Sequence, residues 1–220
     1  MLIVGLTGGV ASGKTAVSEV LKEEGAYIID ADQIARELVQ PYGPAWNELI
    51  KTFGKEILQG DGSIDRKKLA DRVFVDPNQR KLLNRILHPL ITEEMDRRTR
   101  EIGQKNPEAI VVIDAPLLIE VGYHRRVDEL VVVTSTEAKQ IERLKARDGI
   151  NSEEALRIVS SQMPVEEKVK LADFVIRNEG SLGETRERAK EVFRELRKIA
   201  LVRRQTVSCQ CKKGGKKERL

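Results

Sequence analysis

GGVASGKT at residues 8–15 is the most informative stretch of this sequence. Its two glycines at positions 8 and 13 are followed by Lys14 and Thr15, which is the spacing of a phosphate-binding loop. The apolar run LIVGL at residues 2–6 predicts a buried strand, and residues 16–24 have the apolar periodicity of a helix. A phosphate-binding loop joins a strand to a helix, so the neighbouring sequence supports this interpretation.

The residue types of the loop match the chemistry of phosphate binding. Gly8 and Gly13 permit backbone conformations and close contacts that a Cβ atom would prevent, so successive N–H groups can turn toward phosphate oxygens. Lys14 can reach the β and γ phosphates, and the Thr15 hydroxyl can coordinate Mg²⁺. A glycine-rich turn without a ligand is the alternative, but it would not need the Lys-Thr pair. The loop predicts nucleotide binding and leaves the phosphate acceptor unidentified.

Two acids follow the second predicted strand at residues 26–30. Asp30 and Asp32 would lie at the carboxyl end of that strand, where doubly wound α/β proteins bind ligands. One carboxylate could accept the proton of an attacking hydroxyl, or both could hold Mg²⁺ through water. Capping of the next helix is the alternative for either acid. One acid can cap the helix while the other accepts the proton or helps to hold Mg²⁺, so the two interpretations are compatible.

A third acid, Asp114, ends the clearest buried strand of the chain. Residues 109–114 form a nearly continuous apolar run, which is typical of a central parallel strand. In P-loop enzymes a carboxylate at this position relative to the loop steadies the magnesium ion. A capping or solvated Asp114 is the alternative.

A helical pair after the fourth predicted strand, at residues 128–134, has the features of a mobile lid. Its first helix starts near Glu137 and carries Arg143 and Arg147 one turn apart, before a break at Gly149. Guanidinium groups can counter the charge on a transferring phosphoryl group, and a closing lid excludes water. A solvated charged helix face is the alternative.

A fifth strand at residues 172–177 and a final helix at residues 182–202 complete the pattern. Five strands that alternate with helices predict an α/β fold with a five-stranded parallel sheet and helices on both faces. The helical stretch after the second strand is too long for a crossover, so we expect an inserted helical subdomain, interrupted at Asp76-Pro77 and His88-Pro89. The expected segments are a nucleotide-binding core at 1–40 and 105–202, a helical insert at 41–104, a lid at 139–168 and a tail at 203–220.

Composition and charge narrow the class of protein. The chain has 220 residues, 40% of them hydrophobic and 34% charged, and its longest apolar runs are strand-sized. We therefore expect no membrane-spanning helix and, because no secretion signal opens the chain, a cytoplasmic location. Residues 203–220 hold seven Lys or Arg against one Glu but no aromatic residue, which favours a disordered, solvated tail over a nucleic-acid surface. Cys209 and Cys211 in this tail supply only two of the four ligands of a structural zinc site.

Seven short motifs follow one another along the chain: LTGGVASGKT (6–15), IDADQIAR (29–36), LHPL (87–90), DAPLLIE (114–120), RLKAR (143–147), SQMP (161–164) and ADFVIRN (172–178). The phosphate loop alone occurs in many families. Its ordered combination with the double-Asp, His-Pro, Asp-x-Pro-Leu-Leu and Gln-Met-Pro segments is specific. In this combination the chain resembles the dephospho-coenzyme A kinase family over about residues 2–200, and the resemblance implies a P-loop kinase fold.

The resemblance implies transfer of the γ-phosphoryl group of ATP to the ribose 3′-hydroxyl of dephospho-coenzyme A, with Mg²⁺. Asp32 would accept the hydroxyl proton, and Lys14, Arg143 and Arg147 would act on the transferred group. One departure is Arg177, where the family often has Asp. The implied ATP-binding residues are Gly8, Ala11, Ser12, Gly13, Lys14, Thr15, Ala16 and Asn178. The implied acceptor-binding residues are Asp32, His88, Leu117 and Glu120, and the implied metal ligands are Thr15 and Asp114.

Other functions share part of this pattern. A P-loop kinase for another small acceptor, such as a nucleoside monophosphate, would have the same loop, acid and lid. A GTP-dependent switch would ordinarily carry an Asn-Lys-x-Asp segment, and none occurs in the sequence. A nucleic-acid-associated ATPase would depend on the basic tail. We favour a monomeric kinase that has neither a membrane nor a nucleic acid as its partner.

Overall fold

The computed structural model describes residues 1–213, apart from the side chains of Phe74 and of residues 205–213. The chain divides into two compact units. The first comprises residues 1–28 and the chain from residue 102 onward, and the second comprises residues 29–101. Most of the helical insert expected at 41–104 falls in the second unit. Within the described residues, no helix combines the length and the apolar character needed to span a membrane.

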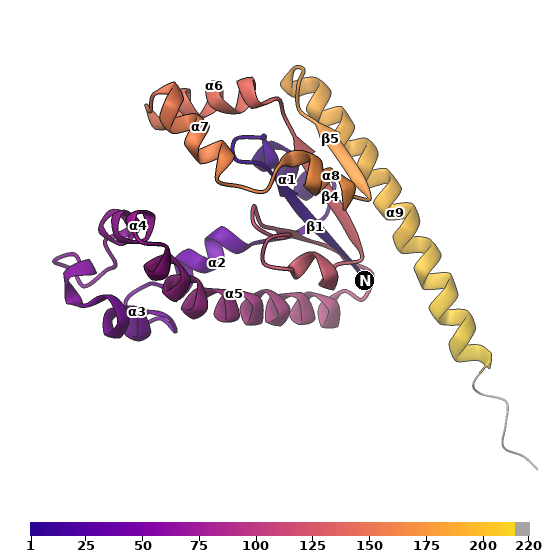
Figure 1. Ribbon diagram of the computed structural model, residues 1–220. Coiled ribbons are helices and arrows are strands. Elements are labelled where there is room, and N and C mark those ends of the chain that lie inside the picture. Colours follow the sequence, from indigo (N-terminus) through magenta and orange to yellow (C-terminus); the bar gives the residue numbers. More distant parts are fainter. Residues whose placement is uncertain (214–220) are drawn as a thin grey trace, which may run out of the picture. The chain divides into compact units, whose positions relative to one another are not determined.

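A five-stranded sheet in the order β2-β3-β1-β4-β5 confirms the predicted fold class. Figure 1 labels three of its strands, β1, β4 and β5. The pairings of β1 with β3, of β1 with β4 and of β4 with β5 are parallel. Leu6 is in register with both Asp114 and Val131, so the carboxyl ends of the three middle strands lie at one edge. The strands are β1 (Leu2–Gly8), β2 (Tyr27–Asp30), β3 (Ile110–Asp114), β4 (Glu129–Thr134) and β5 (Phe174–Arg177).

The helices alternate with the strands, as the periodicity predicts. In the first unit they are α1 (Lys14–Glu23), the 3₁₀ helix η2 (Tyr123–Arg126), α6 (Glu137–Asp148), α7 (Ser152–Ser160), α8 (Val165–Lys170) and α9 (Leu182–Lys213). In the second unit they are α2 (Ala31–Leu38), α3 (Trp46–Phe53), η1 (Lys55–Ile57), α4 (Arg66–Val75) and α5 (Pro77–Lys105), whose last residues continue into the first unit.

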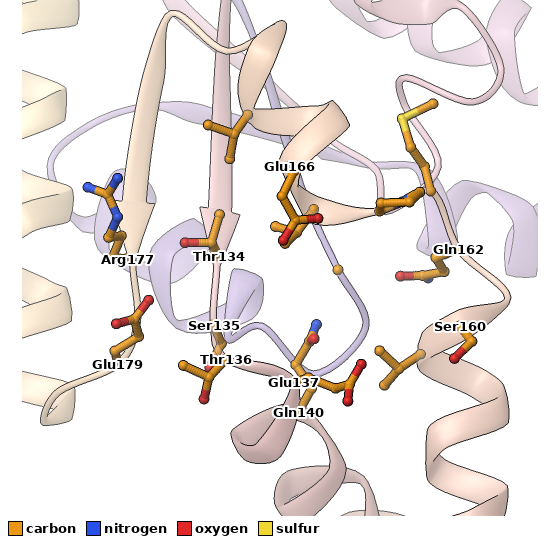
Figure 2. A pocket seen from close by; sticks show the side chains of 16 residues that line it. Thr134, Ser135, Thr136, Glu137, Gln140, Ser160, Gln162, Glu166, Arg177 and Glu179 are labelled. Carbon is orange, nitrogen blue, oxygen red and sulfur yellow. The ribbon is translucent and has the colours of Figure 1, made fainter.

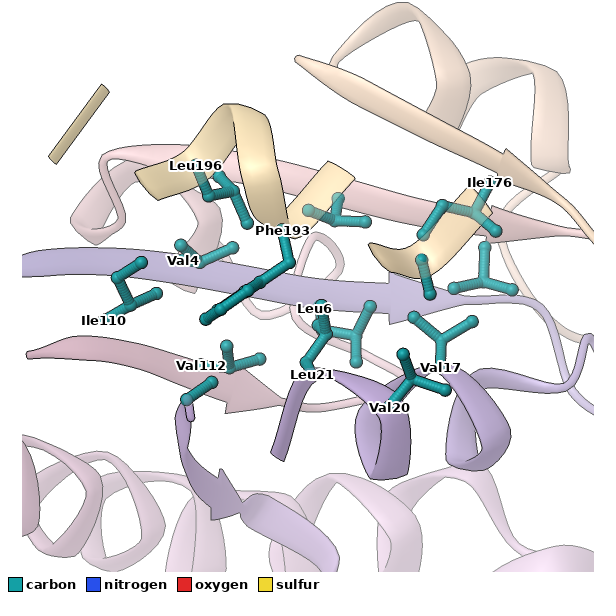
Figure 3. Packing of buried hydrophobic residues seen from close by; sticks show 14 of the residues in the cluster. Val4, Leu6, Val17, Val20, Leu21, Ile110, Val112, Ile176, Phe193 and Leu196 are labelled. Atoms are coloured by element: carbon teal, nitrogen blue, oxygen red, sulfur yellow. The ribbon is translucent and has the colours of Figure 1, made fainter. Parts of the chain in front are cut away.

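One apolar cluster joins α1 and α9 to a face of the sheet (Figure 3). From α1 it takes Val17, Val20 and Leu21, the spacing that places side chains on one helix face. Phe193 and Leu196 of α9 pack on the same cluster and are 1% and 0% exposed. Burial of each large side chain contributes roughly 1.5–3 kcal/mol relative to exposure. This packing fixes the end of β1 and the start of α1, and hence the two ends of the phosphate-binding loop.

The helical insert differs from expectation at one of its two predicted interruptions. Pro77 begins α5, where its missing N–H costs nothing, so the break at Asp76-Pro77 is confirmed. The interruption expected at His88-Pro89 is wrong, because α5 is continuous through Pro89. An internal proline removes one helical hydrogen bond, at a cost of about 3 kcal/mol. In a helix this long, the remaining backbone bonds and the burial of Met95 and Thr99 after the proline outweigh that local cost.

The final helix is longer than the sequence pattern predicts. Its expected end at residue 202 is wrong, as is the disorder expected for residues 203–213, because α9 extends to Lys213. Arg203 pairs with Asp128 and Glu129, and Arg204 pairs with Glu108, so basic residues assigned to a solvated tail have acidic partners on the first unit. The expectation for residues 214–220 and any metal role of Cys209 and Cys211 lie outside the described residues.

Glu94 of α5 provides a test of electrostatic stabilisation in the second unit. Its oxygens accept hydrogen bonds of 2.7 Å from Arg97 and Arg98, which lower its pKa from 4.5 to about 2. A lowered folded-state pKa means that the stabilisation is complete above pH 4.5 and is lost as the pH falls through about 2. We expect Glu94→Gln to lower the free energy of unfolding by about 1 kcal/mol at pH 7, since the pair is partly exposed.

Urea denaturation at pH 7 and at pH 3 checks this expectation for Glu94→Gln. The difference from the unsubstituted protein should shrink at the lower pH. Glu93→Gln is the matched control, because Glu93 is exposed and has no ion pair within the part of the chain that the structure describes. An equal loss of stability in both variants would contradict a specific role of the arginine pair.

Candidate active site

The phosphate-binding loop at residues 8–15 requires glycine for two different reasons. Gly13 has a φ of 92°, a left-handed conformation, and a Cβ there would lie 1.9 Å from Asn178 Nδ2. At Gly8 a Cβ would lie 2.5 Å from the carbonyl oxygen of Val133 on the neighbouring strand. Ala11 also has a positive φ, of 55°, which is uncommon for a residue with a side chain. The loop conformation therefore needs support from its surroundings.

Side-chain donors hold three consecutive carbonyl groups of the loop. Gln140 Nε2 donates to Val10 O at 2.8 Å, Arg143 Nη1 to Ala11 O at 3.1 Å, and Asn178 Nδ2 to Ser12 O at 2.8 Å. In a trans peptide the N–H points away from the C=O, so the following N–H groups turn away from these donors. Ser12 N donates to Gly9 O, whereas the N–H groups of Ala11 and Gly13 have no acceptor in the part of the chain that the structure describes. This arrangement leaves donors available for an anion.

The start of α1 adds positive potential to the loop. No side chain caps this helix and no acid occupies its first turn, so its terminal N–H groups and dipole are not neutralised locally. Ser12 Oγ is buried and has no hydrogen-bond partner in the described part of the chain. Lys14 Nζ donates to Asp114 Oδ1, and the two side chains are 16% and 6% exposed. Backbone donors, helix terminus and lysine together fit a polyphosphate.

The residues expected to hold magnesium lie at the same edge of the sheet. Asp114 ends β3, and Thr15 is exposed in the first turn of α1. Among the side chains that the structure describes, no group of three or more His, Cys, Asp or Glu could enclose a metal ion. This donor set suits Mg²⁺, which commonly takes one or two protein oxygens and completes its shell with phosphate oxygens and water.

The two arginines of the predicted lid differ in their contacts. Arg143 reaches Ala11 O, and it also donates to Ser135 Oγ at 3.3 Å and to Asn178 O at 3.2 Å. Arg147 is exposed and forms a bidentate pair with Asp148 at 2.7 and 2.8 Å. Arg143 therefore supports the loop, whereas Arg147 presents its guanidinium group at the surface.

Asn178 connects the loop to β4 and α9. Its backbone N–H donates to Thr134 O at 2.8 Å, and its Oδ1 accepts from Thr185 Oγ1 at 2.8 Å. The amide side chain is thereby oriented so that Nδ2 faces Ser12 O. The sequence reasoning found Asn178 through the family resemblance but missed Thr185, which carries no local signal in its helix.

A buried lysine organises the segment that follows β3. Lys168 is 0% exposed, and its Nζ lies 2.7 Å from Glu120 Oε1 and donates to Pro116 O at 3.1 Å. Thr7 Oγ1 donates to the same carbonyl at 3.0 Å. Glu120, expected to face the acceptor, thus forms an ion pair, whereas Leu117 is 43% exposed. The sequence reasoning missed Lys168, because a lysine in a charged helix gives no sign of burial.

Three predicted site residues lie in the second unit. Asp30 Oδ1 accepts from Asp32 N at 2.8 Å and Gln33 N at 3.1 Å, so the helix cap is Asp30. The Asp32 side chain is exposed in the first turn of α2. His88 is half-buried in α5, and burial lowers its pKa below the ordinary value of 6.5. At pH 7 this histidine is mainly neutral, so it can bind an anion through a hydrogen bond rather than an ion pair.

A cavity of about 700 Å³ lies beside the loop in the first unit (Figure 2). Its wall includes Gly9 of the loop, Gln140 of α6 and Gln162 of the segment after α7. Arg177 and Glu179, at the end of β5, line another part of the wall. Gln162 belongs to the SQMP motif quoted for the family resemblance but was given no role there, and Gln140 was missed. Gln140 stands three residues before Arg143, on the same helix face, and this spacing was the available signal.

Comparison with known proteins agrees with these features. The sequence model of the dephospho-CoA kinase family matches residues 2–184. A dephospho-CoA kinase from Carboxydothermus hydrogenoformans is 49% identical over 84% of this chain and 89% of its own, and one from Corynebacterium glutamicum is 44% identical over 89% and 100%.

Two solved structures are similar. The crystal structure of TT1252 from Thermus thermophilus has a TM-score of 0.75 and 34% identity, with 89% of this chain and 97% of the other covered. The dephospho-CoA kinase from Campylobacter jejuni has a TM-score of 0.60 and 26% identity, with 88% and 96% covered. The similarity therefore extends through nearly the whole of each relative.

Proposed function

Because this chain belongs to the dephospho-CoA kinase family, we propose that it transfers the γ-phosphoryl group of ATP to the ribose 3′-hydroxyl of dephospho-CoA. The products are CoA and ADP, and the reaction is the final step of CoA synthesis. The observation that carries the proposal is the match between the sequence model of the family and residues 2–184 of this chain. It includes the loop, Asp32, Asp114 and the arginine-bearing helix α6.

The transfer exchanges one phosphorus–oxygen bond for another. The 3′ oxygen forms a bond to the γ phosphorus, while the bond from that phosphorus to the β–γ bridging oxygen breaks. ADP leaves with the bridging oxygen, and the hydroxyl proton passes to a base. We assign the role of the base to Asp32, because it occupies the matching position of the family motif and its carboxylate is exposed. Asp30 instead serves as the helix cap.

The phosphate chain of ATP is assigned to residues 8–16. The N–H groups of Ala11 and Gly13, together with the start of α1, would bind its oxygens, and Lys14 would stabilise charge on the transferred group. Thr15 and Asp114 would hold Mg²⁺, which when bound supplies positive charge to the β and γ phosphates.

The remaining site residues are assigned by family position. Asn178, already bonded to the loop, would border the ATP base, and exposed Arg147 would counter charge during transfer. Neutral His88 and exposed Leu117 would contact the acceptor. Glu120 would act there through its ion pair with Lys168, by holding the segment that carries Leu117. A cytoplasmic location and a monomeric state remain predictions.

An ADP-release assay with a panel of acceptors tests the function. We expect rapid ADP release with dephospho-CoA and Mg²⁺, and a loss of activity when EDTA removes the metal. Several nucleoside monophosphates serve as competing acceptors. Faster turnover with one of these than with dephospho-CoA would identify a different acceptor, and ADP release that does not depend on any acceptor would contradict a kinase.

A further inference from the structure

We propose that Gln140 and Gln162 are positioning residues that clamp Val10 and so orient the loop for ATP. The inference rests on the proposed function and assigns to this site two residues outside the phosphate-loop motif. Gln162 Oε1 accepts from Val10 N at 2.7 Å, and Gln140 Nε2 donates to Val10 O at 2.8 Å. One residue of the loop is thus held through both of its backbone polar groups.

The direction of both hydrogen bonds follows from chemistry. A backbone N–H can only donate and a backbone C=O can only accept, so Gln162 must present its oxygen to Val10 and Gln140 must present its amide nitrogen. Gln140 is 6% exposed, which limits exchange of its bond with water. Position 140 therefore requires a hydrogen-bond donor and position 162 requires an acceptor, so substitutions can distinguish the two roles.

The position of the clamp explains why it matters for ATP. Val10 directly precedes Ala11, whose φ of 55° is unfavourable for a residue with a Cβ. The hydrogen bond from Gln140 fixes the carbonyl oxygen of Val10 on one side of the peptide group. Because the peptide is trans, the N–H of Ala11 points to the opposite side, toward the space assigned to phosphate. Gly9 fits the same arrangement, because a Cβ there would lie 2.4 Å from Gln140 Nε2. Without these two hydrogen bonds the turn at Val10 would become ordered only when ATP binds, and the cost of ordering it would lower the affinity for ATP.

The clamp also connects the loop to the two parts of the predicted lid. Gln140 belongs to α6, and Gln162 belongs to the segment between α7 and α8 (Figure 2). Both side chains line the 700 Å³ cavity. Any movement of either segment therefore changes a hydrogen bond to Val10, which links the lid to the nucleotide-binding loop within one unit.

Substitution to Met and to Glu at each position tests the clamp through the equilibrium dissociation constant for ATP, measured by calorimetry without acceptor. Met removes the hydrogen bond at either position, and we expect about tenfold weaker ATP binding in Gln140→Met and Gln162→Met. Glu preserves an acceptor but not a donor. Glu also adds a negative charge near ATP at both positions, so the informative comparison is between the two Glu variants. Gln162→Glu, which keeps an acceptor for Val10 N, should weaken ATP binding less than Gln140→Glu, which loses the donor to Val10 O.

Kinetics and a distant control separate this role from general stability. We expect KM for ATP to rise more than kcat falls, with little change in the melting temperature of the ATP-free protein in the Gln162 variants. Gln104→Glu, at an exposed position of α5, should leave ATP binding unchanged. Equal weakening by Glu at both clamp positions, or unchanged ATP affinity in Gln162→Met, would overturn the proposal. Absence of ATP binding by the unsubstituted protein would instead contradict the proposed function.

Discussion

Asp32→Asn is expected to reduce turnover by roughly 10² or more while ATP affinity stays nearly unchanged. The substitution keeps the size and polarity of the side chain but removes the carboxylate that would accept the hydroxyl proton. Asp32 is exposed in the first turn of α2, and its own side chain does not provide the helix cap. The fold should therefore tolerate the amide, and the loss should appear in kcat.

Asp30→Asn is the matched control for this experiment. Asp30 accepts the capping bonds from Asp32 N and Gln33 N, and asparagine caps helices about as well as aspartate. We expect this variant to retain its melting temperature and most of its turnover. Steady-state ADP release gives kcat, and calorimetry gives ATP affinity. Near-normal turnover in Asp32→Asn would show that another group accepts the proton.

Lys14→Met should lower kcat/KM by roughly 10³, since it removes the cation assigned to the transferred phosphoryl group. The same substitution should also destabilise the protein. Asp114 is 4% exposed and pairs with Lys14, and removal of one partner from a buried ion pair typically costs about 3 kcal/mol or more. Activity and stability would fall together for separate reasons.

A double variant separates the two effects of Lys14→Met. In Lys14→Met/Asp114→Asn the buried carboxylate becomes a neutral amide, so we expect the melting temperature to recover substantially. Activity should stay as low as in the single variant, because the double variant lacks both the lysine and the proposed metal ligand. Urea denaturation and ADP release measure the two quantities. Recovery of activity along with stability would contradict a direct role for Lys14.

Much of the framework could be predicted from local sequence. The apolar run at residues 109–113 indicated a central strand, and the spacing of Val17, Val20 and Leu21 indicated the buried face of α1. These predictions succeeded because strand and helix periodicities are properties of short segments. The phosphate loop was recognised for a related reason, since the φ of Gly13 and the contact at Gly8 make glycine necessary at both positions.

Other local signals were overruled by the surroundings. A proline usually interrupts a helix, yet α5 continues through Pro89. The basic residues Arg203 and Arg204 suggested a solvated tail, yet they pair with acids on the first unit and α9 continues past them. In both places the sequence pattern described only the intrinsic preference of the segment. The length of α5 and its buried residues changed the outcome at Pro89, and ion pairs with residues far along the chain changed it at Arg203 and Arg204.

The sequence by itself determined where the phosphate loop lies, which strand and helix flank it, and which family the site resembles. Only the tertiary structure decided how the loop is held. Gln140, Gln162 and Asn178 reach it from elements more than a hundred residues away, and Lys168 is buried beside Pro116. Short-range periodicity specifies the backbone of each element, whereas a polar side chain acquires its partner only when strands and helices from distant parts of the chain come together.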